Sequence, residues 1–344
     1  MARFFSMVTL AVFLLGSPPD LGAAEANAAT KKTEAEVVVS VDSEMLPEIP
    51  EMVTSFGAAI TGDALYLYGG HTGAAHSYSS EAQASTLYRL RMDGASDWES
   101  IAKGPGLQGL ALVAHQGKLY RIGGFRAKNA EGEEHDLWSQ AEVACFDPKV
   151  GEWSEMPPMP EPRSSFDAAV LGDSIYVMGG WSMQGPDEST WSRSAYRLDL
   201  SDASPQWEKL SKPPFVRRAL SLAAYDGKIF VMGGMQEQGG PSRRVDVYDP
   251  ATDAWSGGPE LNGNMMDGFG SSSFAVGGRL YSSTYSGHLQ RLSEDQSQWE
   301  VIHQLERERF FHRLLPLSGN RLLALGGASM SSGKFELIDV IQLP

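Results

Sequence analysis

The sequence predicts an all-β protein in which six four-stranded sheets form a closed ring. A pattern of two short apolar strands, a turn and a glycine pair spans residues 163–180 (RSSFDAAVLGDSIYVMGG) and recurs four more times, while a sixth copy at 268–285 lacks the glycine pair. The complete pairs begin at residues 69, 123, 179, 233 and 326. One such sheet cannot bury its two apolar faces alone, whereas sheets stacked radially bury each face against a neighbour.

Each copy of the pattern accounts for two strands, and two more follow it. In residues 163–180, strands are expected at 166–171 and 175–178 around the turn Gly172-Asp173. The glycine pair ends the second strand where a side chain would obstruct an approaching backbone. Third strands are expected at 86–92, 143–147, 195–200 and 244–250. The fourth strand carries a tryptophan, an anchor for the contact between sheets, in every unit but the last: Trp98, Trp153, Trp207, Trp255 and Trp299.

These features together resemble a known family. Units of about 50 residues, with the glycine pair, the third strand and the tryptophan, resemble the kelch repeat over residues 36–344. The resemblance implies a six-bladed kelch β-propeller. It is specific for the fold and says little about function, because propellers host many functions.

The two ends of the repeat array predict how the ring closes. The last unit has strands at 313–317, 321–325 and 335–343 and then stops at Pro344, without a fourth strand or its tryptophan. An apolar strand at the other end of the array, 36–45, is followed by a tail similar to residues 153–160. We therefore expect this N-terminal segment to form the outer strand of blade six, which leaves no free sheet edge where the ring closes.

Residues 1–24 are expected to be a secretory signal peptide. Arg3 precedes a mostly apolar run at 4–15, and small residues follow at 22–24 and 26–28. The alternative is a membrane anchor, but the run is shorter than the roughly 18–20 residues that span a bilayer. Residues 25–35 are expected to be a disordered leader. The sequence thus predicts an exported protein, periplasmic or secreted, with no membrane span after signal removal.

Composition excludes some partners and cofactors. A net charge of −15 argues against binding nucleic acid or an anionic membrane surface. Cys145 is the only cysteine, so no intrachain disulfide can form, and we expect it to be a small buried hydrophobe. His71 and His76 lie in a loop without a carboxylate pattern, so no metal is expected, and no motif indicates a cofactor. A monomer is expected.

The chain topology predicts the face that binds a ligand. Residues just before each first strand form an inner ring, and the loops after the glycine pairs form an outer ring that is long at 71–85, 125–141 and 181–194. The inner ring holds Ser55, Gln108, Arg163, Ser165, Arg217, Arg218, Asp267, Phe269, Arg309 and His312. Function concentrates in long loops on a rigid scaffold, so this face is the candidate site.

Seven residues of this face are the candidate ligand contacts: Arg163, Ser165, Trp181, Arg217, Asp267, Arg309 and His312. We expect the arginines to converge on the ring axis with His312; alternatively, each caps strand ends or pairs with a neighbouring carboxylate. Trp138, Trp181 and Trp191 stand outside the repeat positions. Trp181 is expected to contact the ligand, and the other two are expected to pack the long loops onto the propeller.

Two classes of function fit this face. The first is a binding module that recognises a protein or glycan. The second is a sugar mutarotase or epimerase, because the chain resembles the sialic-acid mutarotase group in size, export and blade number. Epimerisation needs an acid/base pair over a ring pocket, for which Asp267 and Asp167 are candidates beside His312 and Arg309. Because no catalytic motif supports this second class, no catalytic residue is assigned.

Overall fold

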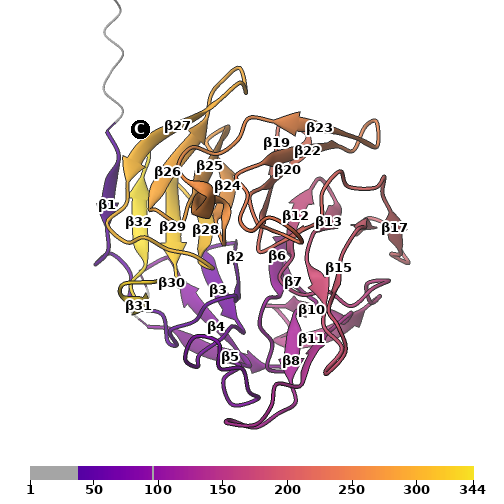
Figure 1. The fold of residues 1–344 in the computed structure, drawn as a ribbon. Helices are drawn as coiled ribbons and strands as arrows, with labels where there is room; N and C mark the ends of the chain where they lie inside the picture. The colour runs from indigo at the N-terminus through magenta and orange to yellow at the C-terminus, as the bar shows by residue number, and fades with distance from the viewer. Residues whose placement is uncertain (1–37, 95–96) are drawn as a thin grey trace, which may run out of the picture. The chain divides into compact units, whose positions relative to one another are not determined.

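A computed structural model describes residues 38–94 and 97–344, and they form a ring of six four-stranded sheets (Figure 1). The predicted six-bladed, all-β fold is confirmed. The predicted signal peptide (1–24) and leader (25–35) lie outside the described residues. Within those residues the only helical segment is the 3-10 turn η1 (Met265–Gly268), and no helix is long and apolar enough to cross a membrane.

The strands follow one another from the inside of the ring to the outside in each of blades one to five. Blade one consists of β2 (Gly57–Thr61), β3 (Ala64–Tyr68), β4 (Thr86–Arg91) and β5 (Glu99–Lys103); blade two of β6 (Ala111–His115), β7 (Lys118–Ile122), β10 (Val143–Asp147) and β11 (Glu152–Met156); blade three of β12 (Asp167–Leu171), β13 (Ser174–Met178), β16 (Ala195–Asp199) and β17 (Trp207–Lys209).

The second half of the ring repeats this order and then closes. Blade four consists of β19 (Ser221–Tyr225), β20 (Lys228–Met232), β22 (Val245–Asp249) and β23 (Ala254–Gly258); blade five of β24 (Ser272–Val276), β25 (Arg279–Ser283), β26 (His288–Leu292) and β27 (Trp299–Gln304); blade six of β28 (Arg313–Leu317), β29 (Arg321–Leu325), β32 (Asp339–Gln342) and β1 (Ser40–Asp42). Cys145 is buried in β10, as expected.

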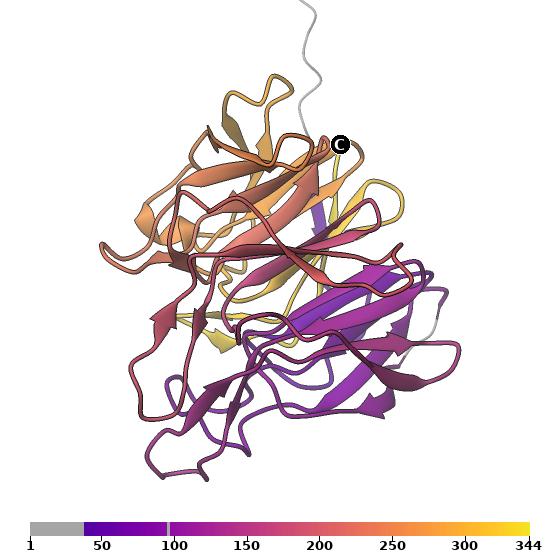
Figure 2. The ribbon, with the colours of Figure 1, turned by 90° about the vertical axis from the view of Figure 1, so that its right-hand side faces the viewer.

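Short ribbons extend the loops that follow the second strands. They are formed by β8 (Phe125–Ala127) with β9 (Leu137–Ser139), β14 (Trp181–Ser182) with β15 (Thr190–Trp191), β18 (Arg217–Arg218) with β21 (Met235–Gln236), and β30 (Ala328–Ser329) with β31 (Gly333–Lys334). In the side view of Figure 2 the loops after β7 and β13 project beyond the strands of the ring. We call this side of the ring the loop face.

Blade six closes the ring with the two ends of the propeller. Strand β1 pairs antiparallel with β32, so that Ser40 lies opposite Gln342, and the two strands lie side by side in Figure 1. Side chains add a second connection, because Asp339 Oδ1 accepts hydrogen bonds from Ser43 Oγ at 2.8 Å and from Arg307 Nη1 at 2.7 Å. The prediction that an N-terminal strand completes the last blade is confirmed.

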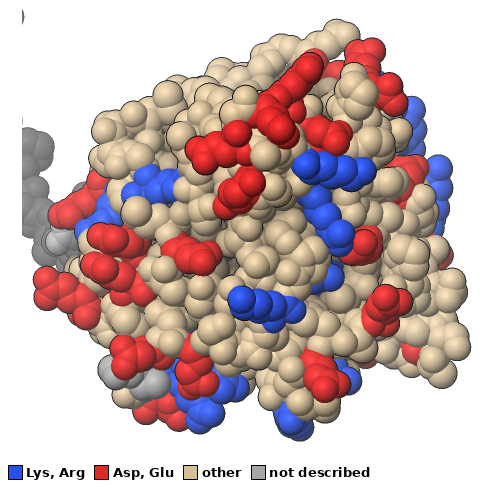
Figure 3. Space-filling view, turned by 90° about the horizontal axis from the view of Figure 1, so that it is seen from below, with Lys and Arg blue, Asp and Glu red and all other residues tan. Residues whose placement is uncertain are grey.

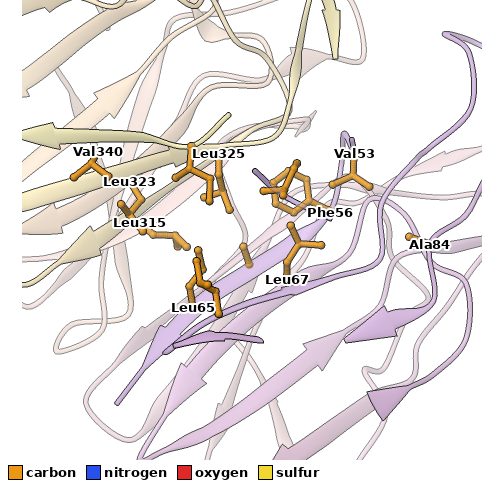
Figure 4. Packing of buried hydrophobic residues seen from close by; sticks show 13 residues of the cluster. Val53, Phe56, Leu65, Leu67, Ala84, Leu315, Leu323, Leu325 and Val340 are labelled. Atoms are coloured by element: carbon orange, nitrogen blue, oxygen red, sulfur yellow. The ribbon is translucent and has the colours of Figure 1, made fainter. Parts of the chain in front are cut away.

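The core lies between the blades rather than at the axis. Six clusters of buried apolar side chains each join two neighbouring blades. The cluster between blades six and one brings Phe56 and Leu67 against Leu323 and Leu325 (Figure 4). The repeat tryptophans act as the expected anchors; Trp153 of blade two meets Tyr68 of blade one edge to face, 5.5 Å between ring centroids.

The glycine pairs bind one blade to the next. The N–H of Gly70 donates to the carbonyl of Leu107 in the next blade at 2.7 Å, and a side chain at Gly69 would place its Cβ 2.6 Å from the same oxygen. Gly69 also has a φ of 67°, which glycine adopts without strain. The pair is therefore required by this close approach of two backbones.

Candidate functional site

A ring of hydrogen bonds surrounds the mouth of the central channel on the loop face. It is built from one residue of each blade, all with φ between 52° and 64°: Ser55, Gly109, Ser165, Ala219, Gly270 and Phe311. The N–H of each donates to the carbonyl of its counterpart in the preceding blade, with N···O distances from 2.7 to 3.2 Å, and the sixth bond closes the circle.

This ring fixes the geometry of the channel mouth. Four of its members are not glycine, although such a conformation costs roughly 1 kcal/mol or more for other residues. The closed set of bonds holds them there, and it leaves a mouth pocket of only about 50 Å³. Candidate Ser165 belongs to the ring and lines this pocket, together with His312.

The channel is blocked just below the mouth by Arg313 of blade six. Its Nε donates to the carbonyl of Phe56 at 3.0 Å and its Nη2 to that of Leu110 at 3.2 Å, in blades one and two. Its Nη1 reaches Asp167 of blade three at 2.9 Å. Asp167 also accepts the N–H of Leu222 in blade four at 2.9 Å. We call this arrangement the channel latch; beyond it lies a cavity of about 200 Å³.

The candidate arginines lie inside their own blades and do not converge on the axis, which corrects the expectation from the sequence. Arg309 is 0% exposed, and its guanidinium donates to the carbonyls of Gly326 at 2.6 Å and Leu337 at 3.0 Å and to Asp339 at 3.0 Å. Its place is at the glycine pair, where it joins the second strand to the third. Every bond it makes stabilises blade six itself.

Arg163 and Arg217 repeat this arrangement in blades three and four. Arg163 binds the carbonyls of Gly179 and Ser194, and Arg217 binds those of Gly233 and Arg244 together with the carboxylate of Asp246. Burial lowers the pKa of both guanidinium groups to about 10, so they stay charged at neutral pH. The geometry favours the alternative reading, in which each arginine caps strand ends and pairs with a carboxylate.

Asp267 is likewise engaged within the fold. It is 0% exposed and belongs to η1, where its carboxylate accepts the N–H of Asn264 at 2.8 Å and that of Ser286 at 2.9 Å. The hydroxyl of Thr284 donates to it at 2.7 Å. These contacts hold the loop after β25 in the one blade that lacks a glycine pair.

Trp181 takes part in a cluster that the sequence did not predict as a unit. Its ring meets that of Trp191 edge to face at 5.8 Å, because β14 and β15 pair these two residues. The guanidinium of Arg218 lies over both, with Cζ 4.1 Å from the ring centroid of Trp181 and 5.3 Å from that of Trp191. We call these three residues the Arg218 cluster.

Arg218 has no anionic partner in the part of the chain that the structure describes. Its Nε lacks a hydrogen-bond partner, and no carboxylate of the described residues forms an ion pair with its guanidinium. Burial lowers its pKa, and the hydroxyl of Tyr78, from the loop of blade one, opposes that shift. A largely buried cation between aromatic rings is thus left without a counterion on the loop face.

Comparison with known proteins agrees with this architecture. Residues 162–214 and 217–262 match the family model of the kelch motif, in the two blades that carry the Arg218 cluster. These two blades are kelch motifs, and the fold of the chain is that of a kelch propeller. It is 29% identical over 223 residues to Kelch-like protein 25 of Xenopus tropicalis, and the match covers 63% of this chain and 35% of that protein.

One further relative and one solved structure are also similar to this chain. The propeller is 25% identical over 209 residues to beta-scruin of Limulus polyphemus, a match that covers 60% of this chain and 22% of that protein. A solved structure titled "Structure of YjhT" superposes with a TM-score of 0.69 over 86% of this chain and 96% of its own, at 17% identity, which shows a shared fold. The propeller spans about a third or less of the first two relatives.

Trp138, the remaining tryptophan of the long loops, connects the loops of blades two and three. Trp138 forms an isolated bridge with Gln184, so the loop of blade two pairs with the loop of blade three. Its Nε1 donates to Asp136 at 2.5 Å, and Lys128 Nζ lies 3.9 Å from its ring centroid. This is the packing role expected for Trp138, whereas Trp191 belongs to the Arg218 cluster.

His312 is buried beside the mouth without polar contacts. It is 3% exposed, and among the described residues neither ring nitrogen has a hydrogen-bond partner. Burial, with the nearby charges of Arg309 and Arg313, lowers its pKa to about 3. His312 is therefore neutral in the folded propeller at neutral pH.

This histidine should make the kelch propeller sensitive to acid. Between pH 6.5 and 3 the unfolded chain binds a proton at position 312 that the folded chain does not, so stability falls as the pH drops. From pH 7 to pH 5 the loss should be about 2 kcal/mol of unfolding free energy. His312→Leu should remove that part of the difference in denaturant unfolding at the two pH values. His76→Asn, at an exposed histidine, is the control; equal losses in all three proteins would contradict the assignment.

Proposed function

We propose that this kelch propeller is a binding module that recognises a carboxylate-bearing protein or glycan ligand on its loop face. The observation that carries the proposal is Arg218, a largely buried guanidinium between Trp181 and Trp191 with no anionic partner in the described part of the chain. On the strength of the composition of residues 1–24, we propose that binding takes place outside the cytoplasm.

The physical chemistry of the Arg218 cluster favours an anion. A buried cation without a counterion loses hydration, and a ligand carboxylate replaces that hydration with two charge-assisted hydrogen bonds in a fork geometry. The indole rings hold the guanidinium in place by cation–π contact, so little conformational freedom is lost on binding. The same rings offer an apolar surface to the part of the ligand next to its carboxylate.

The second candidate, a sugar mutarotase, has one observation in its favour. His312 and Arg313 line the mouth pocket together, and His312 has two free ring nitrogens among the described residues. However, the candidate acids are engaged elsewhere: Asp267 holds the loop after β25, and Asp167 is bound to Arg313. With its pKa near 3, His312 would be a weak base. Binding is therefore the better-supported function.

The test uses the tryptophans of the cluster as reporters. We expect their fluorescence to change on titration with sialic acid, galacturonate or a glutamate-containing peptide, and not with the neutral sugar or glutamine counterparts. Arg218→Gln should weaken binding by roughly ten- to a hundredfold, the scale of a lost charge-assisted hydrogen bond. Trp181→Ala should weaken it by a similar factor, and the melting temperature should move little in either variant.

A matched control keeps this test specific. Arg91 is exposed, pairs with Glu99 across blade one, and lies far along the chain from the cluster, so Arg91→Gln should bind normally. If Arg218→Gln binds as tightly as the wild type, the Arg218 cluster is not the site. Proton NMR of the same sugars reports anomer exchange; acceleration above the spontaneous rate would favour the mutarotase instead.

A further inference from the structure

We propose that the ligand is an acidic polypeptide segment, and that it reaches from Arg218 outward into a second anion-binding pocket at the rim between blades three and four. This inference rests on the proposed function and adds to it the class of ligand and a second contact. The rim pocket has a volume of about 560 Å³ and is lined by Arg193, Lys212, Pro213, Pro214, Phe215, Val216, Arg217, Gln236 and Arg244.

Positive charge is concentrated in the rim pocket. Four cations line it, and three of them are ion-paired. Arg193 pairs with Glu237 at 2.6 Å and Arg244 with Asp246 at 2.5 Å. Arg217 shares Asp246 at the back of the pocket. Four cations against two carboxylates leave an excess of two positive charges, in a protein whose net charge is −15.

Lys212 carries one of these uncompensated charges. It is exposed, and within the described ranges its ammonium has neither an ion pair nor a hydrogen bond. On the face drawn in Figure 3, acidic and basic side chains are interspersed. An excess of cations in a concave site attracts anionic partners, whereas the acidic surface around it repels them.

The rim pocket and the Arg218 cluster are built from neighbouring residues of two segments. Trp191 of the cluster and Arg193 of the pocket are two residues apart, about 7 Å along an extended chain. The ribbon of β18 and β21 makes the same connection, because Arg218 pairs with Met235 and Arg217 with Gln236. A short extended segment can therefore place one carboxylate at Arg218 and another in the pocket.

The floor of the rim pocket favours a polypeptide over a glycan. A sugar ring needs an open aromatic face, but the ring of Phe215 is buried between Trp255, 5.5 Å away edge to face, and the guanidinium of Arg217 at 4.5 Å. What remains is an apolar surface that includes Pro213 and Pro214, edged by cations. The methylenes and carboxylates of glutamate side chains match such a surface.

A hexaglutamate peptide with a fluorescent label at one end is the probe, and the corresponding hexaglutamine peptide is its neutral control. We expect fluorescence anisotropy to show saturable binding of the acidic peptide alone, weakened several-fold between 50 and 300 mM salt because exposed charges are screened. Lys212→Gln and Arg193→Gln should each reduce the affinity about three- to tenfold. Lys149→Gln, at an exposed lysine of blade two, should have no effect.

The outcomes separate this inference from the proposed function. If Arg218→Gln abolishes peptide binding while the rim variants bind normally, the binding module stands and the second contact is wrong. If the rim variants lose affinity and Arg218→Gln does not, the rim pocket stands and the Arg218 cluster is not the site. If trigalacturonate binds as tightly as the peptide and depends on Lys212 equally, the choice of a polypeptide is wrong. Absence of any peptide binding overturns the inference.

Discussion

Removal of residues 36–49 is expected to abolish the cooperative folding of the propeller, whereas removal of residues 1–30 is expected to leave its melting temperature unchanged. The effect of deleting residues 36–49 follows from the way blade six is built. Without β1, the edge of β32 loses its partner along Ser40–Asp42 and exposes unpaired backbone groups. Deletion of residues 1–30 removes only residues outside the described propeller.

Side chains add to the cost of that deletion. Ile49 is 5% exposed and Leu46 packs beside it, both in the cluster that joins blades six and one. Burial of such side chains stabilises a fold by roughly 1.5–3 kcal/mol each. Loss of Ser43 also removes a partner from Asp339, which is 2% exposed. Several such losses together equal the usual 5–15 kcal/mol stability of a domain.

Thermal unfolding and size-exclusion chromatography of the two truncated proteins measure this effect. We expect the protein lacking 36–49 to aggregate or to unfold without a sharp transition. Equal melting temperatures for the two truncations would mean that the ring does not depend on β1 for closure. A milder variant, Val41→Pro, removes a backbone donor from β1 and should lower the melting temperature without deleting any contact of Ile49.

The fold could be predicted because the repeat unit carries its own physical constraints. A glycine pair at the end of the second strand is a local signal, and its cause, a close approach of the next blade such as that of Leu107 to Gly69, recurs in the five blades that have a pair. The outer strand of blade six could be predicted as well, since a closed ring must account for every strand edge and β1 pairs with β32. These signals depend only on local sequence and on the count of strands.

The site was harder to predict because it depends on side-chain direction. Arg217 and Arg218 are neighbours in β18, and alternation along a strand sends one into the blade and the other to the loop face. The sequence favoured Arg217, which binds Gly233 and Asp246, whereas Arg218 has no anionic partner among the described residues. The alternation of side chains along a strand could have distinguished these two arginines. The contact between Arg218 and Trp181 could not be predicted, because it forms only in the folded propeller.

The channel latch could not be predicted for a related reason. Arg313, Asp167, Gly57 and Ala111 occupy equivalent places, each two residues after a member of the hydrogen-bond ring. Only in a closed ring do the small residues of blades one and two leave room for Arg313 of blade six to reach Asp167 of blade three. Arg313 and Asp167 are 146 residues apart in the sequence, so nothing in the sequence indicates that they are in contact.

Arg313→Met is expected to be the most destabilising single substitution in the channel. It removes the bonds to Asp167 and to the carbonyls of Phe56 and Leu110, and it leaves a carboxylate that is 5% exposed without its cation. Breaking a buried pair by removing one partner typically costs about 3–5 kcal/mol. Urea unfolding should show that loss, while Arg321→Met, at an arginine beside the turn of the same hairpin, should cost little.

A double-mutant cycle distinguishes a latch from simple loss of packing. Asp167→Asn keeps the shape of the carboxylate but removes its charge, so once it is present the loss of Arg313 should cost less. The double variant is expected to be more stable, by about 1–3 kcal/mol, than the sum of the two single losses predicts. Strict additivity would mean that Arg313 stabilises the propeller through its two carbonyl contacts alone, and that blades six and three are not coupled across the channel. Coupling of that size would instead show that the latch connects five blades through two side chains, because Arg313 of blade six reaches blades one, two and three and Asp167 also accepts the N–H of Leu222 in blade four.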